Sequence, residues 1–286
     1  MTDTARQPVL LLIPHYNNPQ ALNDSLASIG ADEPCDVLVV DDGSTRSPID
    51  EAGARAAYRG RGVLRFLPLP QNKGIEGALN AGLQWAQSRG YEFIARLDCG
   101  DLNVSDRIQR QLSFLEQHPE VYLLGGAARF VDQQGVEQFV LRHPERHEDI
   151  VKTMRKNSAF VHPAVMYRSA GLATTGLYPL DAPAAEDYAL FYAFVRHFRV
   201  ANLPEVLIHY ELDPGGISLS KRQKQLASRL KVQQANSDGS LAALTGRLRT
   251  RALMVLPYGL VFRLKSALRR KGKTQRSDAE TQREKQ

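Results

Sequence analysis

The sequence is poor in cysteine, with only Cys35 and Cys99 in 286 residues. Two cysteines cannot form a disulfide framework, and they argue against a zinc site. A reducing compartment is therefore the simplest expectation. No histidine lies near Cys99 in the sequence, so we interpret this cysteine as a small residue in a tight turn and not as a nucleophile.

Long hydrophobic runs are also missing. The apolar run 253–262 falls far short of the roughly 20 residues that a membrane-spanning helix needs. The N-terminal segment 1–8 is short and polar, so no secretory signal is expected and a cytoplasmic protein is favoured. A hydrophobic content of 43% is ordinary for a soluble enzyme-sized body.

Positive charge is concentrated at one end of the chain. Residues 241–286 contain 12 Lys and Arg against 3 Asp and Glu, whereas the whole chain has a net charge of only +6. Cations that flank a short apolar run are typical of a segment lying on anionic lipid. We expect this basic amphipathic tail, disordered beyond about Gly272, to attach the protein peripherally to the cytoplasmic membrane. An ordinary helix packed on the body is the alternative, and no nucleic acid is expected because the body is slightly acidic.

Strand-like and helix-like segments alternate through the first half of the chain. Apolar runs at 9–13, 37–40 and 63–67 predict buried strands, and the spacing of apolar residues predicts helices at 19–29 and 75–88. We expect an α/β fold with a mostly parallel sheet and helices on both faces. Ligands bind at the carboxyl ends of such strands, where the sequence places four residues: Pro14, Asp42, Asn72 and Asp98.

Two acid pairs follow buried strands. Asp41-Asp42 ends one strand, and Asp98 and Asp101 flank Gly100 after another. Carboxylate oxygens suit a hard divalent cation, and such a cation can neutralise a nucleotide diphosphate during group transfer. Acids and glycine are also common turn residues, so a plain turn is the alternative interpretation.

Five motifs together resemble family 2 glycosyltransferases over about residues 8–220. They are Pro14-His15-Tyr16-Asn17, Val39-Val40-Asp41-Asp42-Gly43-Ser44, Asn72-Lys73-Gly74, Arg96-Leu97-Asp98-Cys99-Gly100-Asp101 and Ala185-Glu186-Asp187-Tyr188. The resemblance implies an inverting enzyme with the GT-A nucleotide-diphospho-sugar-binding fold. It implies a nucleotide-binding half at about 8–125 and an acceptor half at about 126–220, within a body that ends near residue 240.

The resemblance also implies roles for single residues. Asp42 would bind the pyrimidine of a UDP- or dTDP-sugar, and Pro14 and Tyr16 would line the nucleotide pocket. Asp98 would bind Mg²⁺ or Mn²⁺. The remaining implied donor-site residues are Asn72 and Gly74.

Two departures affect the expected metal site. Many relatives have an acid where this chain has Gly100, which leaves Asp101 as the neighbouring acid. The stretch 210–218 has acids where relatives often carry basic residues, so Asp213 either supplies a further metal ligand or the loop has another job.

Glycosyl transfer by inversion needs a base that takes the proton of the acceptor hydroxyl. Asp187, at the start of a helix-like segment, is the predicted base, with Glu186 in support. Capping of the helix is the alternative for both acids, because a helix N-terminus stabilises negative charge. His162 is a weaker candidate for lining the acceptor site or contacting phosphate.

The predicted function is sugar transfer from a nucleotide sugar to a glycan or lipid-linked acceptor, in cell-surface polysaccharide or lipopolysaccharide synthesis. A nucleotidyltransferase of sugar phosphates is one alternative, although the glycine-rich basic loop expected after its first strand is missing. A non-catalytic membrane-attached scaffold with a degenerate transferase fold is the other.

Overall fold

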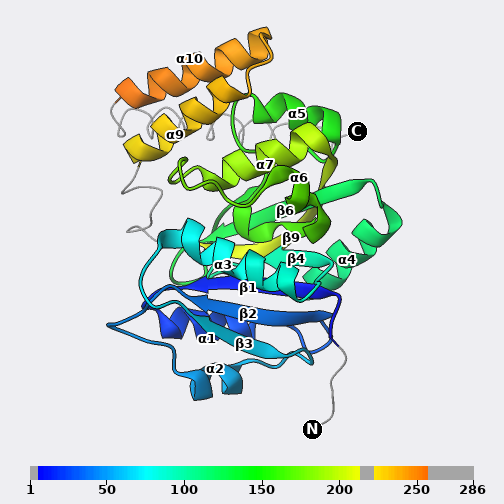
Figure 1. The fold of residues 1–286 in the computed structure, drawn as a ribbon, viewed down its shortest axis with the longest axis vertical. Coiled ribbons are helices and arrows are strands. Elements are labelled where there is room, and N and C mark those ends of the chain that lie inside the picture. Colours follow the sequence, from blue (N-terminus) through cyan, green and yellow to red (C-terminus); the bar gives the residue numbers. More distant parts are fainter. Residues whose placement is uncertain (1–5, 213–221, 257–286) are drawn as a thin grey trace, which may run out of the picture.

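Four parallel strands form the first half of a nine-stranded sheet (Figure 1). Their order is β3-β2-β1-β4. The computed structural model describes residues 6–212 and 222–256. Every residue of β1 is buried, as expected for a strand covered on both faces. The bounds are Val9–His15 for β1, Cys35–Asp41 for β2, Leu64–Pro68 for β3 and Phe93–Arg96 for β4.

Helices connect these strands to one another and to the second half of the sheet, and they cover both faces. They are α1 (Pro19–Ala27), α2 (Glu51–Ala57), α3 (Gly74–Ser88) and α4 (Arg107–Gln117). Side chains alternate along β1, so Leu10 and Leu12 pack in the core beneath α3, whereas Val9 and Leu11 pack in the core beneath α1. The predicted parallel sheet and the two predicted helices in this half are confirmed.

The second half extends the sheet with mixed pairing. Strand β8 lies antiparallel between β4 and β6, and β6 pairs in parallel with β9. The shorter β5 and β7 pair antiparallel with β9 and β6. The bounds are Leu102–Asn103 for β5, Val121–Val131 for β6, Glu137–Leu141 for β7, Met166–Arg168 for β8 and Arg199–Glu211 for β9.

The helices of this half gather above α3 (Figure 1). They are α5 (His147–Met154), α6 (Leu172–Thr175), α7 (Glu186–His197), α9 (Arg222–Ala235) and α10 (Leu241–Val255), and two 3₁₀ turns lie at His162–Ala164 and Ser169–Gly171. Helix α9 packs on α7, and α10 packs on α9. Among the described helices, none combines the length and the apolar character that crossing a membrane would require.

The start of the predicted tail is an ordered helix. In α10 the side chains of Ala243 and Thr250 are buried, and Gly246 lies so close to α5 that a Cβ would sit 2.2 Å from the carbonyl oxygen of Arg155. Residues 241–255 therefore pack on the body, which is the alternative considered for this segment. Residues 257–286 lie outside the described part of the chain.

Candidate functional site

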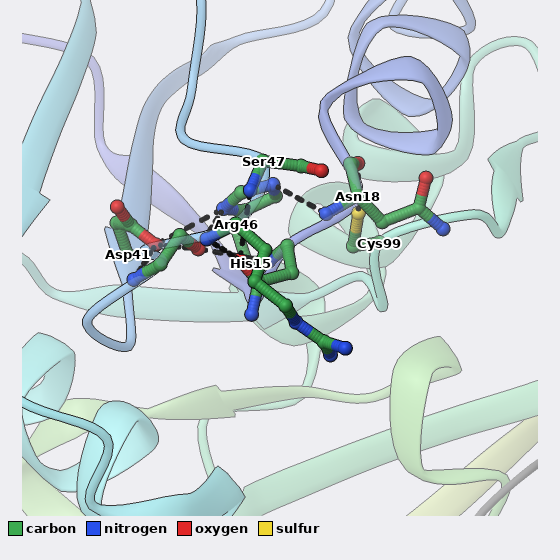
Figure 2. Close-up of polar contacts among 8 residues, drawn as sticks. His15, Asn18, Asp41, Arg46, Ser47 and Cys99 are labelled. Atoms are coloured by element: carbon green, nitrogen blue, oxygen red, sulfur yellow. Dashed lines mark hydrogen bonds and ion pairs between the residues drawn. The ribbon is translucent and has the colours of Figure 1, made fainter.

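The ends of β1 and β2 are joined by a hydrogen-bond network (Figure 2). The buried His15 accepts the Asn18 N–H at Nε2 (3.1 Å), so its proton lies on Nδ1, which donates to Asp41 Oδ1 at 3.1 Å. Ser44 Oγ donates to the same oxygen (2.5 Å) and accepts the Asn17 N–H at 2.8 Å. These residues hold the two strand ends together, and His15 has a structural role.

The network shapes the loop beside the expected nucleotide pocket. Asn17 has a positive φ of 53°, and its Oδ1 accepts the N–H groups of Arg46 and Ser47, each at 3.0 Å (Figure 2). The preceding Tyr16 is 46% exposed, so its ring is available to a ligand. Pro14, by contrast, is buried within β1.

Asp42 ties the end of β2 to the start of α3. Its carboxylate is buried, and Oδ1 accepts the Lys73 N–H at 2.7 Å. Burial raises the pKa of Asp42, and hydrogen bonds from the N–H groups of Lys73 and Gly74 oppose that rise. Asn72 accepts the Gly74 N–H at 3.2 Å. Three predicted residues, Asp42, Asn72 and Gly74, are thus brought together.

A buried arginine lies beside Asp98. Arg96 is fully buried in β4, and its Nη2 donates to Asp98 Oδ1 at 2.5 Å, while the side chain of Asp98 stays 35% exposed. Burial is the largest single effect on the pKa of Arg96 and lowers it, but the charge and hydrogen bond of Asp98 together with the nearby Tyr178 raise it, and the net shift is upward. Arg96 is therefore a buried cation that is paired with Asp98, and the Asp98 carboxylate stays partly open to solvent.

His162 belongs to the same network. Its Nε2 accepts from Arg96 Nε at 3.3 Å and lies 2.8 Å from the hydroxyl of the buried Tyr178. Burial, followed by the charge of Arg96, lowers the pKa of His162 well below its ordinary value, so the ring is neutral. The structure places His162 as a support for Arg96. The side chain of Asn80 in turn holds the backbone of Tyr178: it accepts the Tyr178 N–H at 2.9 Å and donates to the Tyr178 carbonyl at 2.8 Å.

A tight turn joins Asp98 to Asp101, whose N–H donates to the Asp98 carbonyl at 3.0 Å. Asp101 is buried, and its Oδ1 accepts the Glu211 N–H at 3.2 Å. Burial and the charge of Asp98 raise the pKa of Asp101 well above its ordinary value. Its Oδ2 has no hydrogen-bond partner among the described residues. Cys99 has a pKa raised to about 12 by burial and nearby acids, so it is not a nucleophile.

Asp187 and Glu186 begin α7 on the other side of the site. Asp187 is half-buried, and its Oδ1 accepts the Tyr188 N–H at 2.6 Å. Burial raises the pKa of Asp187, with the charge of Asp98 adding to the rise and the charge of Arg229 in α9 opposing it. Glu186 is more deeply buried, and burial and its neighbour raise its pKa to about 8.

The charges of these groups act on one another although they come from distant parts of the chain. Arg96 lowers the pKa values of both Glu186 and Asp187, and Glu76 in α3 raises those of Asp42 and Glu186. Asp42 and Asp98 follow the carboxyl ends of the parallel strands β2 and β4, where ligand sites in such sheets lie, and α7 brings Asp187 within the electrostatic influence of Asp98.

Comparison with known proteins gives the family. The model of glycosyl transferase family 2 matches residues 11–176. This chain belongs to that family. The amylovoran biosynthesis glycosyltransferase AmsE of Erwinia amylovora is 31% identical, over 75% of this chain and 79% of its own. A UDP-Gal:α-D-GlcNAc-diphosphoundecaprenol β-1,3-galactosyltransferase of Escherichia coli is 27% identical, over 66% of this chain and 67% of its own.

A solved structure agrees at the level of the fold. The mannosyltransferase PcManGT of Pyrobaculum calidifontis, in complex with GDP-Man and Mn²⁺, superposes with a TM-score of 0.59 at 18% identity. The match covers 93% of this chain and 81% of that one. The glycosyltransferase therefore has the expected GT-A fold. Membership of this family does not favour the nucleotidyltransferase or scaffold alternatives.

The departure at position 100 has a backbone cause. Gly100 of this glycosyltransferase has a φ of +104°, which a side chain adopts only with strain. An acid at this position would therefore disturb the turn that places Asp98. Within residues 6–212 and 222–256, no group of three or more His, Cys, Asp or Glu is arranged to hold a metal ion. The remaining predicted ligand, Asp213, lies outside that part of the chain.

Sequence reasoning gave no role to two cationic residues of the glycosyltransferase site. Arg96 sits in the buried run 93–97, and a lone arginine in such a run is the signal that could have found it. Arg229 gave no such signal, because α9 is rich in polar residues and only the packing of α9 on α7 brings it to Asp187.

Gly43 offers a test of the Asp42 loop. Its φ is +69°, and a Cβ there would lie 2.5 Å from the backbone carbon of Gln71. We expect Gly43→Ala to lower the free energy of unfolding by about 1–3 kcal/mol and to weaken nucleotide binding, because the loop that donates to Asp42 must move. Gly135→Ala is the control, since its φ is +77° but nothing lies within 4 Å. Denaturant unfolding and thermal shifts with UDP measure both effects, and equal losses in the two variants would contradict the close-contact argument.

Proposed function

We propose that this glycosyltransferase inverts the anomeric centre of a UDP- or dTDP-linked sugar while transferring it to a hydroxyl of a glycan or lipid-linked acceptor. One observation carries the proposal. Asp187 begins α7, and Phe191 of that helix packs its ring against His162, with the ring centroids 5.6 Å apart. His162 accepts from Nε of Arg96, the partner of Asp98, at 3.3 Å, so the helix that carries Asp187 lies against the Asp98–Arg96 pair. A base and a diphosphate site that share one pocket are what single displacement at a sugar carbon needs.

Asp187 is the proposed base. Its carboxylate accepts the Tyr188 N–H at the start of α7 and feels the positive charge of Arg229, and both effects favour the ionised form. Glu186, with its pKa raised to about 8, keeps its proton near neutral pH. A protonated acid cannot take a proton from the acceptor, so Glu186 supports Asp187 instead.

On the donor side, Tyr16 offers an exposed ring next to His15, whose carbonyl accepts the Asp42 N–H at 2.9 Å. We assign the nucleotide base to Tyr16 and Asp42. Asn72 and Gly74 shape the start of α3 next to them. Pro14 contributes through the buried end of β1 and not through an exposed surface.

A divalent metal fits the site only together with the donor. Asp98 is a partly exposed carboxylate with one oxygen already bonded to Arg96, which is too little to bind an ion tightly by itself. Mg²⁺ and Mn²⁺ are commonly held by one or two carboxylates plus substrate phosphates. Asp98 would hold the ion, with Asp101 Oδ2 as a further ligand once Asp101 loses its proton. The bound ion would neutralise the leaving diphosphate.

The names of the relatives and the charge of the chain support the proposed acceptor and location. One relative is named for amylovoran biosynthesis and another for a diphosphoundecaprenol-linked substrate. Together with the basic residues 241–286, these names support work on cell-surface polysaccharide or lipopolysaccharide. We place the enzyme at the cytoplasmic face of the membrane.

A donor panel tests the proposed function. Purified protein is given UDP-, dTDP- and GDP-sugars with Mn²⁺, with Mg²⁺ or with a chelator, and nucleotide release is measured. We expect release from a uridine or thymidine donor only with metal. A thermal shift with the matching nucleotide should accompany it. Release from GDP-sugars alone would contradict the assignment of the base, and full release in chelator would contradict the metal.

A further inference from the structure

One face of α10 is apolar and exposed. Leu241, Leu244, Leu248 and Val255 are 75%, 44%, 52% and 85% exposed. At 3.6 residues per turn these four positions fall within an arc of about 60°. The buried residues of α10 described above point about the opposite way. The helix thus has one face packed on the protein and one apolar face in solvent, which we call the α10 apolar face.

Arginines border this face. Arg249 and Arg251 are exposed and lie on either side of it, and Arg247 lies near Arg251 on the helix surface. No acid occurs in α10, and residues 257–286 add nine further Lys and Arg against three acids. An apolar stripe with basic borders matches the surface of an anionic bilayer, where apolar side chains enter the acyl boundary and cations meet lipid phosphates.

We propose that the α10 apolar face docks on an anionic lipid bilayer, with the axis of α10 in the plane of the membrane. The proposal rests on the membrane location given under the proposed function and specifies the contacting surface. The surface proposed to contact the membrane is then the outer face of residues 241–255, and not the run 253–262 predicted from the sequence. A second copy of the chain fits the face less well, because a two-fold contact would bring the arginines of both helices together with no acid on either helix to balance them.

The docking surface is connected to the acceptor side of the site. Helix α10 packs on α9, and α9 carries Arg229, whose charge acts on Asp187. The Asp181–Lys231 ion pair (2.5 Å) joins α9 to the segment before α7. An enzyme held by α10 therefore has α9 and then α7, which begins with the proposed base, as the next helices behind its docking surface.

Vesicle co-sedimentation of the full chain tests the proposal. Leu244→Glu/Leu248→Glu places two charges on the face, and Val136→Glu/Leu180→Glu places the same charges on exposed apolar residues (58% and 72%) elsewhere. With vesicles of phosphatidylglycerol and phosphatidylcholine, we expect wild type and control to pellet alike and the α10 variant to bind at least tenfold more weakly. Pure phosphatidylcholine should bind all three poorly. Raising salt to 1 M should weaken binding of wild type, because the Debye length falls to about 3 Å.

Equal pelleting of the α10 variant and the control would overturn the proposal. Leu241→Glu/Val255→Glu, at the two most exposed positions of the face, repeats the test if the first variant melts early. A wild-type dimer that ignores vesicles and becomes monomeric in the α10 variant would assign the face to a second copy instead. Nucleotide release in solution is read separately. If the α10 variant loses vesicle binding but still releases nucleotide, the docking surface is supported. If the wild type pellets with vesicles but releases nucleotide from no donor, only the proposed activity is contradicted.

Discussion

Asp187→Asn is expected to bind the nucleotide donor normally and to lose about 10²-fold or more of its transfer rate, the loss typical of removing a general base. The amide keeps the size of the side chain, and its oxygen can still accept the Tyr188 N–H that Asp187 Oδ1 accepts at 2.6 Å. It cannot take the proton of an acceptor hydroxyl. Single-turnover transfer and a thermal shift with UDP separate the chemical step from binding.

Glu186→Gln is the matched control for that experiment. Because the pKa of Glu186 is raised to about 8, the side chain is already neutral at pH 7, and the neutral amide should change transfer little. A large loss in Glu186→Gln with full activity in Asp187→Asn would move the base to Glu186.

The pH profile gives an independent check on the same assignment. Burial raises the pKa of Asp187, so its protonated, inactive form persists to higher pH than for an ordinary aspartate. Transfer by the wild type should therefore rise with pH along an acidic limb. That limb should disappear from the residual activity of Asp187→Asn.

The first half of the fold follows from the sequence because β1, β2 and β4 are buried on both faces. The run 63–67 was expected to be buried as well, but β3 is an edge strand in which only Leu64 is buried. A short continuous apolar run such as 37–40 predicts a buried strand, and the polar residues after it mark the end of the strand. The mixed second half is harder to predict. The three residues of β8 are too few to show a periodicity, and β6 and β9 pair although 67 residues lie between the end of β6 and the start of β9.

The site was predictable where single residues stand at strand ends, and unpredictable where packing creates the environment. The sequence placed Asp42 and Asp98 after strands and Asp187 at the start of a helix, and the structure has them there, while their functional roles stay predictions. The pairing of Asp98 with Arg96 depends on a buried guanidinium, and apolar periodicity carries no information about such a partner. The packing of α10 was hidden for a related reason. Close helix contact uses small residues such as Gly246, which hydropathy does not distinguish from solvent-facing ones.

The buried ion pair between Arg96 and Asp98 determines how the prediction that Asp98 binds a metal should be tested. Asp98→Ala would leave the fully buried Arg96 without its carboxylate, and breaking a buried pair costs about 3–5 kcal/mol. Because Asp98 is 35% exposed, water offsets part of this cost and the lower end is expected. A loss of activity in Asp98→Ala would therefore mix unfolding with loss of the metal ligand. Asp98→Asn avoids this, since its amide oxygen can still accept from Arg96 while the charge is gone.

We expect Asp98→Asn to fold with a melting temperature near that of the wild type and to lose about 10²-fold of metal-dependent turnover, because a neutral amide is a far weaker ligand for a hard cation. Asp101→Asn is the comparison. Asp101 is buried and holds the Glu211 N–H, so this variant should reduce turnover less. Nucleotide release measured against Mn²⁺ concentration separates the two, with Asp98→Asn shifting the half-saturating concentration upward more strongly. If Asp98→Asn works at the wild-type rate in chelator, Asp98 binds no ion and its carboxylate serves only to neutralise Arg96.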